Sequence, residues 1–295
     1  MILVAANPFS GAGPNRRRVD ALVAVLDGLG AAPRVAWSAS ERAAIFADAE
    51  AMRGCRAVIA AGGDGTVAQV INELPPGVPL AVLPLGNENL VARALGFGRE
   101  PIALARAVVR GRTRALDLGR ATAGSQTRLF ALMISVGFDA AVVHRVAAWR
   151  VAENGLRRVR RWSYLGPIVA CTVQYAHTAL TVAADALTAE GAHCMIANIP
   201  AYPLGIALTP EASAEDGRLD WIVLERRGML PLARYCLAAL RGRHRRRPDV
   251  RAGQATRLTL TAATPVPVQL DGDPWGTTPV AVEVVPRALT VVATD

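Results

Sequence analysis

The 295-residue sequence contains no lysine, although its arginines give it a formal net charge of +9. This absence excludes the phosphate-binding lysine of a Walker-type P-loop, the strand lysine of protein kinases and a Schiff-base nucleophile. Backbone amides, hydroxyls, arginines or a metal ion must therefore hold any phosphate group that the protein binds.

Cysteine and histidine are scarce and widely spaced. The four cysteines contain no CxxC pair, and we expect them to be reduced thiols in the core of a cytoplasmic protein. The histidines are equally isolated, which argues against a histidine-based zinc site. The residues concerned are Cys55, Cys171, Cys194 and Cys236, and His144, His177, His193 and His244.

Long uncharged runs are also rare. Residues 162–184 carry no formal charge and are numerous enough to cross a bilayer. Gly166-Pro167, Gln174 and His177 interrupt this run, so we predict a buried helix followed by a strand instead. The N-terminus lacks the basic region of a signal peptide, and residues 2–6 predict a first strand.

The first hundred residues alternate apolar strands with amphipathic helices. Strands are predicted at residues 2–6, 35–37, 57–61 and 78–85. Ser40 is the expected N-cap of one helix, whose buried face extends to Met52. This alternation predicts a parallel α/β domain over residues 1–118, with ligands bound where loops leave the carboxyl ends of the strands.

After residue 118 the pattern changes to strands separated by turns rich in Gly, Pro, Asp and Ser. We predict a mainly antiparallel, β-sandwich-like domain over residues 119–285. Helical insertions are expected at residues 140–175 and 230–240.

The strongest motif is the turn that follows the third predicted strand. It reads Gly62-Gly63-Asp64-Gly65-Thr66, and Thr66 with Gln69 resembles a capping box that opens a helix. The glycines and the positive end of the helix favour binding of a polyphosphate. Asp64, at the tip of the turn, is placed to contact magnesium through water.

Two further loops are expected at the same edge of the parallel sheet. The first contains Asn7, Ser10 and Gly11, and the second contains Gly86, Asn87 and Glu88. Each loop alone is ordinary, but three loops that leave three parallel strands indicate a nucleotide cleft.

These residues resemble the diacylglycerol kinase catalytic family, which includes bacterial diacylglycerol kinases and the sphingosine and ceramide kinases. The resemblance extends over essentially the whole chain. The Gly62-Gly-Asp-Gly-Thr turn is also shared with NAD kinases and phosphofructokinases, which implies a nucleotide-binding α/β domain like theirs over residues 1–118. The family resemblance rests on Asn7-Pro-Phe-Ser-Gly, Gly62-Gly-Asp-Gly-Thr-Val, Asn72-Glu73, Leu83-Pro-Leu-Gly, Asp117-Leu-Gly, Ser135-Val-Gly-Phe-Asp139-Ala, Asp216-Gly-Arg-Leu-Asp220 and Asp271-Gly-Asp273.

The resemblance implies phosphoryl transfer from ATP, with Mg²⁺, to a hydroxyl of a diacylglycerol-like lipid. It also implies that residues 286–295 return to complete the first domain. Asp273 matches the general base, while Asp64 and Asp117 match acids of a magnesium and water network. Asp216 and Asp220, with Glu215 nearby, match a second metal site, for which a simple hairpin turn is the alternative.

The sequence departs from the family pattern after the fourth predicted strand. Asn87 replaces a threonine and Leu90 replaces an acid, so Glu88 is the candidate for the missing charge. Asp273 stands where a glutamate is usual. Two alternatives therefore remain open. One is a kinase of the same nucleotide fold that acts on a soluble substrate such as NAD, and the other is a catalytically degenerate lipid-binding or regulatory protein.

Arginine runs at residues 157–161 and 241–247 concentrate positive charge in the second half. No nucleic-acid recognition motif accompanies them. We expect peripheral docking at a membrane surface that contains anionic phospholipid, because each arginine near such a surface contributes about 1 kcal/mol of attraction. The sequence leaves the oligomeric state open.

Overall fold

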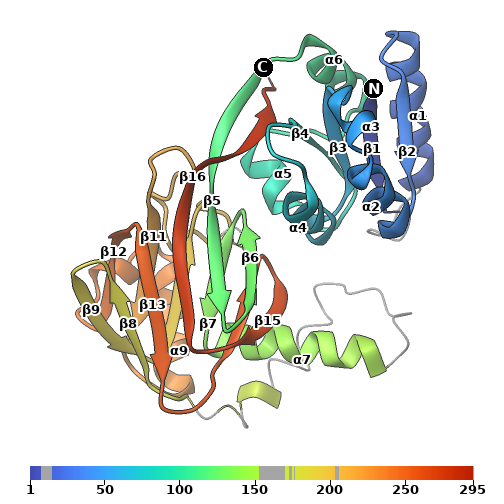
Figure 1. Ribbon diagram of the computed structural model, residues 1–295. Helices are drawn as coiled ribbons and strands as arrows, with labels where there is room; N and C mark the ends of the chain where they lie inside the picture. The colour runs from blue at the N-terminus through green and yellow to red at the C-terminus, as the bar shows by residue number, and fades with distance from the viewer. Residues whose placement is uncertain (8–14, 153–169, 173–174, 176, 203–205, 295) are drawn as a thin grey trace. The chain divides into compact units, whose positions relative to one another are not determined.

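The computed structural model describes residues 1–7, 15–152, 170–172, 175, 177–202 and 206–294 (Figure 1). The chain divides into two units, one formed by Met1–Asp117 together with Pro286–Asp295 and the other by Leu118–Val285. It passes between them inside two strands, β5 (Thr113–Ala123) and β16 (Val280–Val292). The first unit is therefore assembled from two stretches that are distant in sequence.

The first unit is built on a parallel sheet with the strand order β2-β1-β3-β4. The end of β16 adds to it in parallel, with Val291 paired to Leu80 of β4. Every residue of β1, β3 and β4 is buried, as expected of parallel strands that are covered on both faces. The strands are β1 (Ile2–Ala6), β2 (Pro33–Ala36), β3 (Ala57–Gly62) and β4 (Leu80–Pro84).

Helices connect these strands and cover the sheet (Figure 1). Val19, Leu22 and Leu26 form the buried stripe of α1, which packs against α6. The helices are α1 (Asn15–Gly28), α2 (Ala39–Ala47), α3 (Ala49–Arg53), α4 (Asp64–Glu73), α5 (Leu90–Ala94) and α6 (Pro101–Arg110).

The expected helix from Ser40 to Met52 is wrong in two respects. Ser38, not Ser40, is the N-cap of α2, and its Oγ accepts a hydrogen bond from the Glu41 amide at 3.1 Å. The helix also ends at Asp48, whose carboxylate caps a separate helix, α3, by accepting two amide hydrogen bonds. The periodic apolar residues continue across this break, so periodicity alone did not reveal it.

The second unit contains a six-stranded antiparallel sheet with the order β12-β11-β10-β7-β14-β15. Its other strands are β16, β13, β8 and β9, with the β5–β6 pair beside β16. These strands are β6 (Gln126–Phe130), β7 (Met133–Val136), β8 (Leu180–Ala184), β9 (Leu187–Gly191), β10 (His193–Ala197), β11 (Leu219–Leu224), β12 (Val250–Ala255), β13 (Arg257–Ala262), β14 (Pro267–Leu270) and β15 (Asp273–Thr277).

One apolar core joins the two sets of strands in this unit. It contains Phe130 and Ile134, Trp221 of β11 and Leu258 of β13, all of them buried. Side chains of both sheets thus meet in a shared core, which is the arrangement of a β-sandwich. The predicted fold class, a parallel α/β domain followed by an antiparallel β domain, is confirmed.

Among the described residues of the second unit, α7 (Phe138–Ala152) and α9 (Met229–Leu240) lie between strands, residues 170–172 are also helical, and a short turn η3 (His244–Arg246) follows α9. Residues 153–169, where the first predicted insertion continues, lie outside the described residues. Residues 180–184 form the strand predicted in the second half of the uncharged run. Among the described helices, none has the length and apolar character that crossing a membrane requires.

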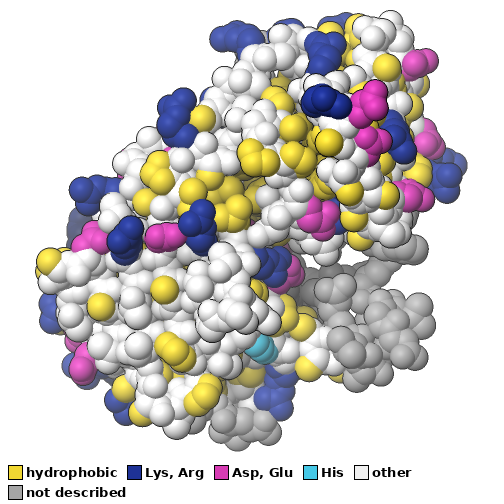
Figure 2. Space-filling view, in the orientation of Figure 1, with side chains coloured by type: hydrophobic (Ala, Val, Ile, Leu, Met, Phe, Trp, Pro, Cys, Tyr) yellow, Lys and Arg dark blue, Asp and Glu magenta, His cyan; other side chains and the backbone are white. Residues whose placement is uncertain are grey.

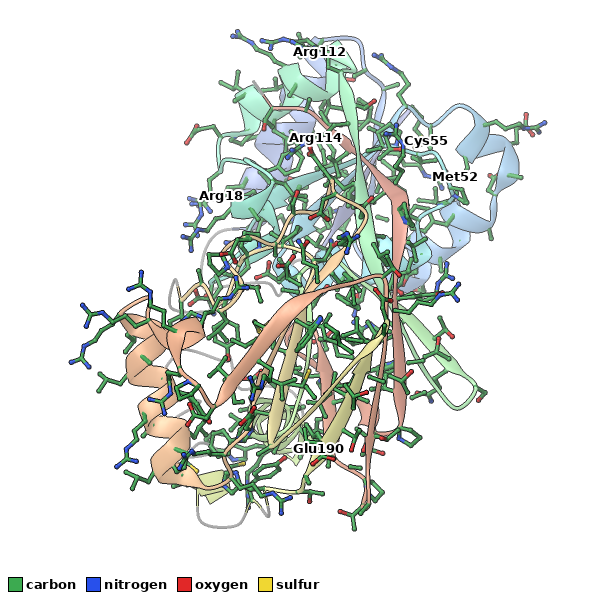
Figure 3. The ribbon with its side chains drawn as sticks, turned by 90° about the vertical axis from the view of Figure 1, so that its left-hand side faces the viewer. Arg18, Met52, Cys55, Arg112, Arg114 and Glu190 are labelled. Atoms are coloured by element: carbon green, nitrogen blue, oxygen red, sulfur yellow. The ribbon has the colours of Figure 1, made fainter. Side chains whose placement is uncertain are left out.

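The cysteines are free thiols, but they are not all in the core. Cys55 beyond α3 is half-buried (Figure 3), Cys171 and Cys194 are buried, and Cys236 of α9 is exposed. The expectation of four core thiols is therefore wrong for Cys236. On the face shown in Figure 2, arginine side chains are dispersed among uncharged atoms.

Candidate functional site

The turn from β3 into α4 brings the backbone of the glycine motif to one edge of the parallel sheet. Gly62 ends β3, Gly63 is the N-cap and α4 begins at Asp64. A Cβ on Gly62 would lie 2.4 Å from Thr66 Oγ1, so this position requires glycine. The N-cap residue makes no side-chain cap, which leaves the positive end of α4 directed at this edge.

The predicted capping box at Thr66 is wrong. Thr66 is the third residue of α4, and its hydroxyl oxygen accepts a hydrogen bond from Asn7 Nδ2 at 3.2 Å. The box requires its threonine at the N-cap, whereas here Gly63 occupies that position in an extended conformation. Thr66 instead links the helix to the loop that follows β1.

The three predicted loops of the first unit lie together. The Asn7 amide donates to the Ala61 carbonyl at 3.0 Å, and the Leu85 amide donates to the Gly62 carbonyl at 2.9 Å. Gly63 and Gly86 approach so closely that a Cβ on Gly86 would lie 2.6 Å from the Gly63 Cα. Gly65, in the first turn of α4, is exposed. Ser10 and Gly11, also predicted here, lie outside the described residues.

Asp64 is not at a loop tip, as its motif suggested, but is the first residue of α4. Its Oδ1 accepts a hydrogen bond from the Val91 amide at 3.0 Å, in the first turn of α5. Burial raises the pKa of this carboxyl above its ordinary value. Asp64 therefore connects two helix N-termini in addition to any contact with a metal ion.

The loop after β4 is closed by a residue that sequence analysis missed. Asn89 is buried and left-handed, with φ at +50°. Its Oδ1 accepts from the Gly86 amide and its Nδ2 donates to the Gly86 carbonyl, both at 2.8 Å. Asn87 is exposed and Glu88 is half-buried on this loop. The available signal was the preference of asparagine for the left-handed region.

Asp117 lies where β5 leaves the first unit. It is buried, and its Oδ1 accepts a hydrogen bond from the Arg287 amide at 2.8 Å. Arg287 belongs to β16 and has a left-handed backbone, with φ at +52°. Asp117 therefore connects the two crossing strands.

In the second unit, the late acidic motif contains two carboxylates with different surroundings. Asp271 is buried and accepts hydrogen bonds from the amides of Ala131, Leu132 and Met133 at 2.8–2.9 Å. Burial raises the pKa of Asp271 to about 6. Asp273 is 40% exposed, and its Oδ2 accepts from Arg128 Nη2 at 2.8 Å. Asp271 thus anchors the turn, while Asp273 is accessible.

A polar network behind this turn was also missed. Gln269 accepts from the Gly272 amide at 2.7 Å and donates to Ser135 Oγ at 2.8 Å. Ser135 donates in turn to Asp139 at 2.6 Å. Tyr202 donates to the other Asp139 oxygen at 3.0 Å, and burial raises the Tyr202 pKa. The network links three stretches of the chain, residues 135–139, Tyr202 and residues 269–272, so the motif that contains Ser135 and Asp139 does not reveal it alone.

Asp216 and Asp220 are brought together by Gln254, whose Nε2 donates to both carboxylates at 3.3 and 3.1 Å. Burial raises the pKa of Asp220. Within the described residues, no group of three or more His, Cys, Asp or Glu could hold a metal ion. This pair alone therefore provides only part of a metal site.

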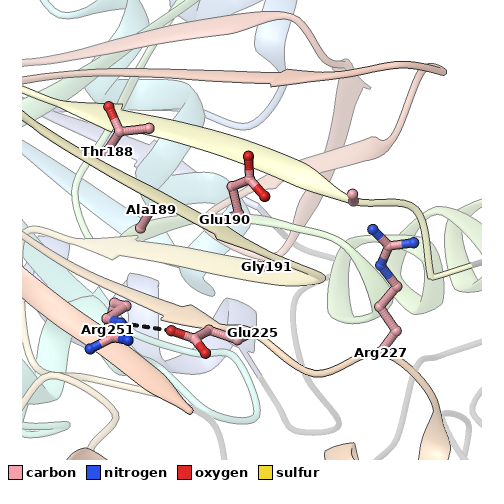
Figure 4. Close-up of a pocket in the computed structure, with 8 residues that line it drawn as sticks. Thr188, Ala189, Glu190, Gly191, Glu225, Arg227 and Arg251 are labelled. Atoms are coloured by element: carbon pink, nitrogen blue, oxygen red, sulfur yellow. Dashed lines mark hydrogen bonds and ion pairs between the residues drawn. The ribbon is translucent and has the colours of Figure 1, made fainter. Parts of the chain in front are cut away.

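A cavity of about 370 Å³ opens in the second unit (Figure 4). Its charged lining residues are Glu190, Glu225, Arg227 and Arg251, and Arg251 Nε lies 2.6 Å from Glu225 Oε1. No predicted site residue that the structure describes is among the lining residues. The cavity is therefore separate from the loops and acids above.

Comparison with solved structures supports the fold. A diacylglycerol kinase structure from Bacillus anthracis str. Sterne aligns with a TM-score of 0.70 and 17% identity, covering 99% of this chain and 96% of that one. An NAD kinase from Archaeoglobus fulgidus, in complex with ATP, aligns with a TM-score of 0.55 and 11% identity over 100% of this chain and 94% of that one.

Three curated relatives extend the similarity to sequence. A diacylglycerol kinase of Mycobacterium tuberculosis (strain ATCC 25618 / H37Rv) is 28% identical, over 97% of this chain and 92% of that protein. One of Bacillus subtilis (strain 168) is 26% identical, over 78% and 75%. An uncharacterized Synechocystis protein is 28% identical over 80% of this chain, which spans about half (54%) of that relative.

Two family matches together account for nearly the whole chain. Residues 1–121 match the diacylglycerol kinase catalytic domain. Residues 132–293 match the YegS C-terminal NAD kinase beta sandwich-like domain. The chain therefore belongs to the diacylglycerol kinase family and is a kinase of that family.

Proposed function

We propose that the protein transfers the γ-phosphoryl group of ATP to a hydroxyl group of a lipid of the diacylglycerol class. One observation carries the proposal: three segments of the first unit converge at the N-terminus of α4. They are Asn7, Gly62–Thr66 and Gly86–Asn89. Family membership and the names of the curated relatives support the lipid acceptor.

The phosphates of ATP bind, in this proposal, against the N-terminus of α4. Its backbone amides and positive helix end attract anions, and the Gly63–Gly86 contact leaves only backbone atoms between the two loops. The side chain of Asn7, already hydrogen-bonded to Thr66, borders the same place. Backbone amides and a polar side chain can thus bind the phosphates in a chain that has no lysine.

Mg²⁺ is part of the proposal, with Asp64, Glu88 and Asp117 as its acids. Because no three described acids lie close enough together to hold an ion directly, these acids would contact it largely through water and the phosphates. It would supply charge neutralisation on the phosphates. Asp64 begins α4 and Glu88 lies on the loop after β4, and a carboxylate donor set suits this hard cation. Asp216 and Asp220 are the proposed ligands of a second ion.

Asp273 is the proposed general base that accepts the proton of the lipid hydroxyl. Its carboxylate is accessible, Arg128 fixes its orientation, and the Asp271 anchor and Gln269 hold its turn. A carboxylate within reach of an alcohol can accept its proton as the phosphoryl group transfers.

We also propose that the enzyme is cytoplasmic. Because its substrate is dissolved in a bilayer, it would associate peripherally with membranes rich in anionic phospholipid. The net charge of +9 supports attraction to such a surface.

The decisive experiment incubates the protein with labelled ATP and a panel of detergent-dispersed lipids, and then extracts the products into organic solvent. We expect label in the extract with diacylglycerol and none without a lipid acceptor. Label on NAD or another soluble acceptor would favour the soluble-substrate alternative, which the NAD kinase fold supports. Lipid binding without any labelled product would favour a degenerate, regulatory protein.

A further inference from the structure

The outward face of α9 carries large apolar side chains. Leu230, Leu237 and Leu240 are 64%, 48% and 66% exposed. They are spaced by seven and three residues, which places them along one side of the helix. The opposite side is packed into the unit through Tyr235 and Ala239. An exposed leucine alone is ordinary, but three in one helical stripe form a contact surface.

Arginines border this stripe. Arg234 and Arg241 each follow a stripe leucine by four residues, so each lies beside it on the helix surface. Arg243 and Arg246, just beyond the helix, are also exposed. Side chains that end in nitrogen project from α9 and from the turn that follows it (Figure 3).

Two arginines of the run at residues 241–247 form ion pairs with acids of the same unit. Arg247 makes two 2.9 Å hydrogen bonds with Asp249 and lies over the Tyr235 ring, 5.0 Å from its centroid. Arg245 forms an ion pair with Glu211. Arg243 and Arg246 are exposed, and neither forms an ion pair with an acid among the residues that the structure describes. They are therefore the two arginines of residues 243–247 that can reach a lipid phosphate without giving up an ion pair.

The helix and the turn after it are held firmly. Tyr235 donates to the Asp249 carbonyl at 3.0 Å and accepts from the Arg226 amide at 3.1 Å. His244 is buried and donates from Nε2 to the Leu208 carbonyl at 2.9 Å. The leucine stripe is therefore presented on a fixed support.

We propose that this α9 face, defined as Leu230, Leu237 and Leu240 with Arg234, Arg241, Arg243 and Arg246, docks into the surface of an anionic bilayer. The leucines enter the boundary between headgroups and acyl chains, roughly 5–10 Å deep, and the arginines contact lipid phosphates. Charge complementarity argues for this occupant over a second copy of the chain, since two such faces would repel. The inference deepens the proposed function by naming its membrane contact.

The test measures sedimentation with vesicles of phosphatidylcholine and phosphatidylglycerol. The triple variant Leu230→Ser, Leu237→Ser and Leu240→Ser should bind roughly tenfold more weakly or worse, because apolar burial supplies much of such an affinity. Leu187→Ser is the matched control, since Leu187 is 60% exposed on β9, and it should bind like the parent. Unchanged thermal unfolding will establish that the exposed serines leave the fold intact.

The arginines are tested with Arg234→Gln and Arg241→Gln together. This variant should bind anionic vesicles more weakly than the parent at low salt, and the difference should shrink as salt screens the charges. Arg257→Gln, whose parent side chain is 82% exposed on β13, is the control and should behave like the parent.

Sedimentation of the triple variant equal to that of the parent would overturn the proposal. So would light scattering that shows a parental dimer and a monomeric triple variant with unchanged vesicle binding, because a second copy would then cover the face. Phosphorylation of detergent-dispersed lipid should be retained by the triple variant. If the parent fails that assay while its vesicle binding needs the leucines, the lipid kinase assignment fails and the docking face stands.

Discussion

Asp271 and Asp273 are separated by a single glycine, and the fold gives them different tasks. Asp271 satisfies three backbone amides that would otherwise be buried without an acceptor. Asp273 has an accessible carboxylate with one ionic partner. At the scale of single residues, burial therefore separates an anchoring acid from the proposed base, which the motif alone could not do.

Asp273→Asn preserves the size of the side chain and removes its basicity. We expect turnover to fall about 10²–10⁴-fold with little change in KM, as is typical of a lost general base. Steady-state kinetics with detergent-dispersed lipid measures this. Arg128→Gln, which removes the orienting partner, should have a smaller effect that also appears in kcat. Near-parental turnover of the Asp273 variant would place the base elsewhere.

The Asp64→Asn variant tests the proposed nucleotide site through Mg-ATP affinity, without any measurement of turnover. The amide oxygen of asparagine can still accept the hydrogen bond from the Val91 amide, so α5 should remain in place. Loss of the charge should weaken Mg-ATP affinity roughly tenfold to a hundredfold. Calorimetric titration measures the affinity, with unfolding temperature as the control. Unchanged affinity would mean that Asp64 has only the structural task.

His193 predicts a pH dependence of stability. Burial, with a smaller contribution from the charge of His177, lowers the His193 pKa to about 4. The unfolded chain therefore binds this proton near pH 6.5 while the folded chain does not. The free energy of unfolding should consequently fall as pH drops from 6.5 toward 4, by at most about 3 kcal/mol from this residue.

The measurement compares denaturant unfolding of the parent and His193→Gln across this pH range. Other groups, including Asp271, titrate in both proteins and cancel in the difference. The free energy of unfolding should fall less steeply with decreasing pH for His193→Gln than for the parent. Parallel curves would show that His193 does not bind its proton differently in the two states.

At the scale of elements, the close approach of the β3 and β4 loops has an energetic consequence. A methyl group on Gly86 would lie 2.6 Å from Gly63 Cα and 2.9 Å from Asn89 Oδ1. Gly86→Ala should therefore destabilise the fold by about 1–3 kcal/mol and weaken ATP binding. Gly98→Ala is the control, because that position has open space. Equal unfolding midpoints and affinities of the two variants would contradict the loop geometry.

The strands of the parallel sheet were predictable because whole runs such as Ile2–Ala6 are buried and apolar. Helix ends were less so. Ser38 and Ser40 are equally plausible caps in sequence, and Asp48 interrupts a periodic apolar face without disturbing its spacing. Local patterns specify an element's type better than the residue at which it begins.

Some residues of the candidate site could be predicted from the sequence, and others could not. The glycine turn and the acids were visible as motifs, since close backbone approach and anion binding require those residue types. Gln269, Tyr202 and Arg128 were not visible, because each acts through a residue far away in sequence. Only the folded chain brings such partners within hydrogen-bonding distance.

At the scale of the whole molecule, the first unit depends on both of its stretches. A fragment of residues 1–117 would leave β4 without its β16 neighbour and Asp117 without the Arg287 amide. We expect this fragment to be unfolded or aggregated by circular dichroism and light scattering. Joining residue 117 to residue 286 through a short flexible linker should restore a cooperative transition, since Asp117 and Arg287 are in contact. A stable fragment of residues 1–117 alone would refute the dependence.

The returning strand also sets the order in which a ribosome can complete the protein. β1 to β4 are synthesised first, yet Val291, which pairs with Leu80 at their open edge, follows residues 118–285. Synthesis of that intervening segment takes roughly 10–30 s at ordinary elongation rates. During this interval the β4 edge of the nascent sheet is unpaired. Its backbone groups must then form hydrogen bonds with water or with a chaperone.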